Sequence, residues 1–126
     1  MKKLRNMQAM ANENFLISYD TSTALKIGRW SIIRDYPTNT SKKHLRAWLD
    51  DYYGLESVKG SMFECYKNYR NSAECAIFTA RRLHHEYIIL HCTEDGWWTY
   101  ATYSTRKEME NDVFYHLLLQ DITPTI

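Results

Sequence analysis

Six residues have the chemistry to bind a metal ion or to take part in nucleophilic catalysis, namely Cys65, Cys75, Cys92, His84, His85 and His91. Their spacing matches neither the paired CxxC of a zinc site nor the HExxH of a metalloprotease. His91 and Cys92 are neighbours in a segment typical of a strand, so their side chains point to opposite faces and cannot share an ion without distortion. The sequence therefore predicts no metal site and no cofactor.

Enzymatic chemistry has weak support in the same residues. Free cysteine is among the most often buried residue types, which explains a cysteine better than a nucleophilic pair with a distant histidine does. His84-His85-Glu86 is typical of a polar turn, although a histidine with a carboxylate would suit general acid–base catalysis. The four glycines are too scattered to form a phosphate-binding loop. We expect a non-enzymatic protein, and a small enzyme with a His/carboxylate site at His84, His85 or His91 is the alternative.

A basic cluster begins the clearest helix of the sequence. Lys42, Lys43 and Arg46 lie in its first two turns, where the helix dipole favours anions, and Arg81 would extend the cluster. Residues 1–50 contain nine basic and four acidic residues, whereas residues 51–126 contain seven basic and eleven acidic ones, so the two halves could instead pair with each other. The net charge of only +1 argues against a dedicated nucleic-acid module. Nucleic-acid binding through this cluster and exposed aromatic rings remains an alternative.

Amphipathic aromatic residues are numerous. The chain has 10 Tyr, 4 Trp and 4 Phe among its 126 residues. Tyr and Trp carry a polar tip that needs a partner, and they collect at protein interfaces. This composition predicts a contact surface.

A β-hairpin over residues 87–103 would position that surface. The turn Glu94-Asp95-Gly96 separates two apolar strands. A three-residue loop would place one set of side chains on a single sheet face: Tyr87, Ile89, His91, Trp97 and Tyr103. A two-residue turn would shift the register and regroup them. We predict that this set binds a partner, unless helices cover both faces of the sheet.

The remaining elements are predicted from periodicity. Residues 45–53 form an amphipathic helix that ends at Gly54, and the last helix begins with the capping box of Thr105 and Glu108. Residues 15–33 resemble a hairpin whose second strand has a bulge at Gly28. Residues 57–70 and 73–83 fit either a helix or a strand, and a strand is favoured for residues 73–83 because it would pair with the strand that follows.

These elements predict one α+β domain over residues 15–120, with an antiparallel sheet of four to five strands packed by two to three helices. Residues 1–14 are expected to be a flexible or weakly ordered tail, and residues 121–126 a loose C-terminus. Three cysteines, an odd number, and the lack of an apolar signal segment predict a cytoplasmic protein with no membrane partner.

We expect a small protein that inhibits or modulates another macromolecule by steric contact. Phage anti-defence inhibitors, such as anti-CRISPR proteins, and toxin-immunity proteins are of this type. A protein target is the expected partner, with nucleic acid and a second copy of the chain as alternatives. The identity of the target, the source organism and the choice between monomer and homodimer are left open by the sequence.

Overall fold

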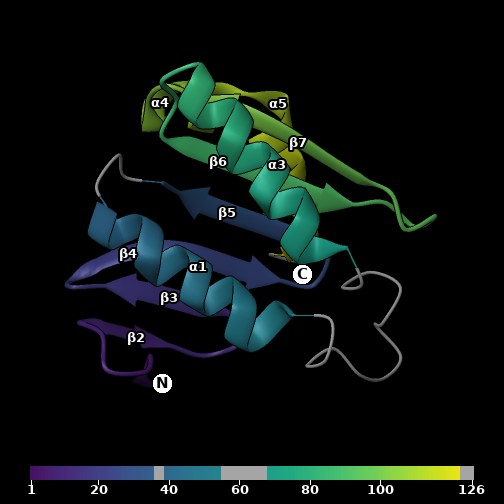
Figure 1. Cartoon of the computed structure of the whole chain (residues 1–126). Helices are drawn as coiled ribbons and strands as arrows, with labels where there is room; N and C mark the ends of the chain where they lie inside the picture. Colours follow the sequence, from purple (N-terminus) through teal and green to yellow (C-terminus); the bar gives the residue numbers. More distant parts are fainter. Residues whose placement is uncertain (36–38, 55–67, 123–126) are drawn as a thin grey trace.

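The computed structural model describes residues 1–35, 39–54 and 68–122. In this part of the chain, one antiparallel sheet holds seven strands in sequence order, so that each strand pairs with the next (Figure 1). The strands are β1 (Lys2–Lys3), β2 (Ala9–Ala11), β3 (Phe15–Ser18), β4 (Thr21–Ile27), β5 (Trp30–Arg34), β6 (Tyr87–Cys92) and β7 (Trp98–Tyr103). The helices are α1 (Asn39–Tyr53), α3 (Tyr69–Arg82), α4 (Arg106–Asn111) and α5 (Val113–Ile122). The α+β class is confirmed, and the expected numbers of strands and helices were too low.

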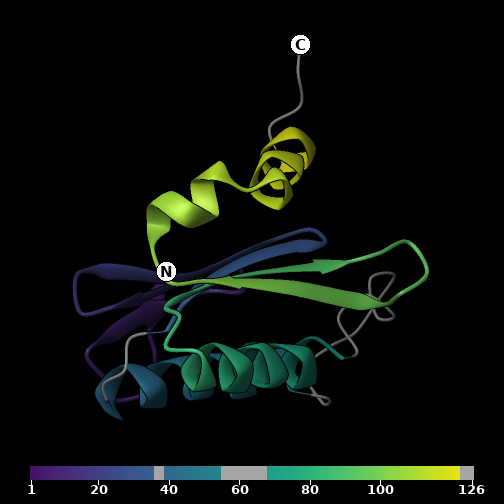
Figure 2. The same ribbon diagram turned by 90° about the horizontal axis from the view of Figure 1, so that it is seen from above.

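Helices lie on both sides of the sheet (Figure 2). The first face is covered by α1 and α3, and the second face carries α4 and α5. We use these two names throughout. Alternate residues of each strand point to opposite faces, so each strand contributes to two separate cores.

The core of the first face is the larger one. It contains Trp48 from α1, Tyr69 from α3 and Ile88 from β6, all with 0% exposure. Ala73, Ala76 and Ala80 also have 0% exposure, and these small side chains allow α3 to pack closely. Aromatic contacts connect the layers, since the ring centroids of Tyr53 and Tyr69 are 4.5 Å apart.

The core of the second face consists mainly of aromatic and aliphatic side chains beneath α4 and α5. Its buried members are Trp30, Tyr87, Ile89, Tyr103, Met109 and Leu118. The Trp30 indole N–H donates a hydrogen bond to the Asp121 carboxylate (2.7 Å), which ties β5 to α5. The two cores together bury many of the aromatic side chains that the composition had suggested would lie on a contact surface.

The N-terminal expectations were wrong. Residues 1–14 contain β1 and β2 rather than only a tail, because Leu4, Ala9 and Ala11 are buried in the first core. Gly28 does not form a bulge in one long strand. With a φ of +58°, it begins a two-residue turn between the paired residues Ile27 and Trp30. This turn separates β4 from β5, where the sequence had predicted one long strand.

The helical expectations were partly right. The helix over residues 45–53 is confirmed as part of α1, and it ends before Gly54 as expected. Residues 73–83 were wrongly assigned to a strand, since α3 runs through them to Arg82 and its alanines recur at helical spacing. The ambiguous residues 57–70 lie largely outside the described residues. The last helix is two helices, because the extended ψ of 144° at Asp112 separates α4 from α5.

The hairpin of β6 and β7 has the three-residue loop. The Thr93 amide donates to the Trp97 carbonyl (2.7 Å), and Gly96 has a φ of +85°. Tyr87 therefore pairs with Tyr103 and Leu90 with Tyr100. The two-residue alternative is excluded.

The second core should contribute strongly to folding. Ile89→Ala removes a side chain of 0% exposure and should lower the free energy of unfolding by about 2–5 kcal/mol. Ile27→Ala, at a site that is 40% exposed, should lower it by about 1 kcal/mol or less. Urea denaturation of both variants measures this, and equal losses would contradict the packing of α4 and α5 against the sheet.

Candidate functional site

The structure separates the residues that were predicted to bind a partner. Tyr87, Ile89 and Tyr103 are buried beneath α4 and α5 and do not lie on an exposed surface. The physical reason is that the second face at β6 and β7 is too apolar to stay in water, so the C-terminal helices fold back over it. Trp97 lies in the hairpin turn and is 74% exposed. The prediction that these five residues form one exposed binding surface was therefore wrong.

His91 also packs within the second core. Its ring stacks on Trp30 with the centroids 3.9 Å apart. Burial lowers the pKa of His91, and Arg29 adds to this effect, whereas Asp121 opposes it. The ring is a packing element that is favoured in its neutral form.

The predicted basic cluster is divided among ion pairs. Arg46 lies 3.5 Å from the Glu74 carboxylate, and Arg81 forms two hydrogen bonds of 2.7 and 3.1 Å with Asp35. Lys43 is exposed on α1. Ion pairs thus engage two of the four basic residues, which weakens the nucleic-acid alternative. Of these two pairs, only Arg46–Glu74 joins a basic residue of residues 1–50 to an acidic residue of residues 51–126.

A polar cavity brings together several residues that the enzyme alternative needs. It has a volume of about 420 Å³ and is lined by Asp35, Lys42, Arg81, His84, His85, Glu86 and Ser104. The His85 ring nitrogen Nδ1 lies 2.9 Å from the Thr102 hydroxyl, which is a neutral partner. Asp35 is held by Arg81, and Glu86 lies 3.8 Å from Arg34. The carboxylates are thus occupied by arginines rather than by the histidines.

A serine–histidine pair lies elsewhere in the fold. The Ser18 hydroxyl is 2.6 Å from Nδ1 of His44, and both side chains are buried. Burial lowers the pKa of His44. The pair connects β3 to α1 and is buried between them, so we interpret it as structural. No group of metal-ligating side chains was found among the described residues.

The second face is only partly covered. In Figure 1, α4 and α5 lie behind the upper strands, whereas β2 and β3 have no described helix behind them. On β4, Leu25 and Ile27 lie at the margin of α5, since they line a small pocket together with Leu118 and Ile122. Five apolar side chains on these strands form what we call the open sheet face: Met10, Phe15, Ile17, Leu25 and Ile27. Met10, Phe15 and Ile27 are 40%, 37% and 40% exposed, and Ile17 and Leu25 are half-buried.

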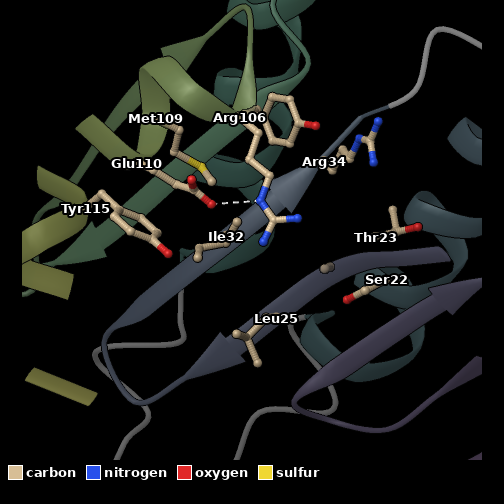
Figure 3. Close-up of a pocket in the computed structure, with 11 residues that line it drawn as sticks. Ser22, Thr23, Leu25, Ile32, Arg34, Arg106, Met109, Glu110 and Tyr115 are labelled. Carbon is tan, nitrogen blue, oxygen red and sulfur yellow. Dashed lines mark hydrogen bonds and ion pairs between the residues drawn. The ribbon is translucent and has the colours of Figure 1, made fainter. Parts of the chain in front are cut away.

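An arginine-lined cavity borders the open sheet face (Figure 3). We call it the arginine pocket. It has a volume of about 210 Å³, with Leu25 and Ile32 from the sheet, Met109 from α4, and the charged residues Arg34, Arg106 and Glu110. Figure 3 shows Arg106 extending from α4 over the strand that carries Ile32.

Two arginines and one glutamate are the charged residues that line this pocket. Arg106 pairs with Glu110 at 2.8 Å, one turn further along α4. Arg34 stacks over the Tyr87 ring at 5.1 Å and lies 3.8 Å from Glu86. Two guanidinium groups thus share the pocket with the single carboxylate of Glu110. This arrangement suits a ligand that combines an apolar body with a carboxylate or phosphate.

Comparison with protein-family models, curated proteins and solved structures found no match to the chain. Within the described residues, no helix has the length and apolar character needed to cross a membrane.

The arginine pocket was missed by the sequence reasoning. Arg34 and Arg106 are far apart in the chain, and only the return of α4 over the sheet brings both to one cavity. The sequence carried a partial signal for the open sheet face. Leu25 and Ile27 alternate with other residues along one strand, as Phe15 and Ile17 do along another, so each pair lies on one face of the sheet. Nothing in the local pattern distinguished these residues from core residues.

Truncation of Tyr103 and truncation of Trp97 to alanine should have very different effects on the free energy of unfolding. Tyr103 is buried, and its hydroxyl donates to Asp112; burial, with this carboxylate, raises the Tyr103 pKa. Tyr103→Ala should lower the free energy of unfolding by about 3–5 kcal/mol, and Trp97→Ala should change it by about 0.5 kcal/mol or less. Thermal and urea denaturation measure both. A large loss in Trp97→Ala would show that the hairpin turn is packed.

Acidification should lower the stability of the fold. His44 and His91 have lowered pKa values in the folded state, so the unfolded chain takes up protons first as the pH falls through about 6.5. Their contribution is complete above that pH and decreases below it. Urea midpoints at about pH 7.5 and 5.5 should show the decrease.

The histidine variants identify the source of this pH dependence. A double variant, His44→Gln with His91→Gln, should show a smaller change between the two pH values than His84→Gln, whose site is exposed. Equal changes in the two variants would refute the assignment.

Proposed function

We propose that the protein is a non-enzymatic binding protein that holds a segment of a partner protein on the open sheet face, with an acidic side chain of that segment in the arginine pocket. Bound there, it would inhibit or modulate its target by steric contact. The observation that carries the proposal is the continuity of an exposed apolar strip with a pocket that presents the guanidinium groups of Arg34 and Arg106.

The apolar strip supplies the affinity in this proposal. Phe15 pairs with Leu25, and Leu25 pairs with Ile32, so one row of side chains runs across β3, β4 and β5 toward the arginine pocket. Apolar side chains from a partner would remove this row from water. Contiguous exposed apolar surface of this kind is a common mark of a protein-binding site.

The two arginines supply orientation. A guanidinium binds a carboxylate through two parallel hydrogen bonds, and the apolar floor of the pocket strengthens such a contact by excluding water. Glu110 and Glu86 already lie beside Arg106 and Arg34, so an acidic group of the partner would share the two guanidinium groups with these carboxylates. The partner segment is therefore expected to alternate apolar residues with an Asp or Glu.

Binding is better supported than catalysis. The described lining of the arginine pocket contains no histidine or cysteine, and its carboxylate is paired with Arg106. The polar cavity holds two histidines, but its carboxylates are engaged by arginines. A protein partner is also a better fit than nucleic acid, because the open sheet face is aliphatic rather than basic.

A peptide array tests the proposal without knowledge of the natural target. Wild-type protein should select peptides that combine Leu, Ile or Phe with an acidic residue. Ile27→Glu should reduce binding of the best peptide by at least about tenfold, because it places a charge in the apolar contact. Arg106→Gln should weaken acidic peptides and spare their amide analogues.

Phe78→Glu is the matched control. Phe78 is 70% exposed on α3, on the opposite side of the sheet, and this change should leave peptide binding unaltered. The proposal fails if no peptide is selected, or if Ile27→Glu and Phe78→Glu bind equally well with their folds intact by circular dichroism.

A further inference from the structure

The two edges of the sheet differ in their protection. The edge strand β1 has two residues, both lysine, which is a short and charged edge of the kind that resists pairing. The other edge strand, β7, has six residues with no charge and no proline: Trp98, Thr99, Tyr100, Ala101, Thr102 and Tyr103. A long uncharged edge is a template for another strand.

The register defines which backbone groups of β7 point outward. Thr93 and Trp97 are hydrogen bonded at the turn, and antiparallel pairs alternate from there. The N–H and C=O groups of Thr99, Ala101 and Tyr103 therefore face β6. Those of Trp98, Tyr100 and Thr102 face away from it. Among the described residues, β7 pairs only with β6.

Exposed aromatic side chains accompany this edge. Tyr100 is 41% exposed, and its hydroxyl lies 2.9 Å from the hydroxyl of Thr79 on α3. The neighbouring Phe78 is 70% exposed. The exposed ring of Tyr100 thus belongs to the edge strand itself, and a strand added to β7 would cover part of it.

We propose that β7 is a dimerisation edge, where β7 of a second copy of this chain pairs antiparallel about a two-fold axis at Tyr100. The three outward-facing residues are evenly spaced, so Tyr100 meets Tyr100 of the second copy, and Trp98 meets Thr102 of the second copy. Each of these pairs exchanges two backbone hydrogen bonds. The strand carries no charge that would repel its copy, so the edge is complementary to itself.

The oligomeric state tests the dimer. Sedimentation equilibrium over a wide concentration range should give a species of twice the 15.1 kDa chain mass. Tyr100→Pro removes an outward N–H while the ladder bonds of Thr99 and Ala101 to β6 remain, so it should yield a folded monomer. Ile27→Glu, on the open sheet face, should remain a dimer, which separates this contact from the proposed peptide-binding surface.

Hydrogen exchange of the wild-type protein tests the same contact without a variant. The amides of Trp98, Tyr100 and Thr102 should be protected in concentrated protein and should exchange rapidly on dilution, whereas those of Thr99 and Ala101 stay protected in both. A monomer at every concentration, unprotected amides in the concentrated sample, or a dimer that persists in folded Tyr100→Pro would overturn the proposal. Dissociation of the dimer by Ile27→Glu would also overturn it.

Discussion

The structure depends on one constraint, which is that the strand β6 is apolar and largely buried on both faces. Ile88 and Ile89 are neighbours with 0% exposure, and they point to opposite sides of the sheet. One helical layer cannot bury both, so the chain must supply a second layer after β7. The helices α4 and α5 meet this need, and the fold becomes a sheet between two helical layers. The burial of Tyr87 and Tyr103 follows directly from that arrangement.

The same constraint explains the aromatic composition. A small protein with two cores needs more large side chains than one with a single core, and tyrosine can fill the margin of a core while its hydroxyl reaches a partner. Tyr69 contacts the Ser31 hydroxyl at 2.6 Å, and Tyr103 donates to Asp112. The hydroxyls thus tie elements together within the monomer. Among the described residues, the rings that remain exposed are those of Phe15, Tyr19, Phe78, Trp97 and Tyr100.

The second helical layer is short, and its shortness creates the candidate site. The helices α4 and α5 cover the second face at β5, β6 and β7 and leave Met10, Phe15 and Ile27 of β2, β3 and β4 exposed on that face. Arg34 and Arg106 meet at the boundary between covered and open sheet, where apolar surface adjoins charge. The combination of apolar area with the guanidinium groups of Arg34 and Arg106 at this boundary favours recognition of a partner segment over covalent chemistry. The uncovered β7 edge is a separate feature, since it offers backbone groups rather than side chains.

The amino-acid sequence by itself determined the local elements whose signals are short in range. The amphipathic helix before Gly54, the cap formed by Thr105 and Glu108, and the hairpin turn at Gly96 depend on neighbouring residues, and all three are present. The choice between a two-residue and a three-residue loop in that turn came from the structure. Tertiary structure alone decided what depends on distant contacts. The alanines of α3 suited either a helix or a strand until the sheet they pack against was known, and β2 has too few residues to show a period. The arginine pocket likewise exists only because α4 returns over β5, a contact between residues that are far apart in the chain.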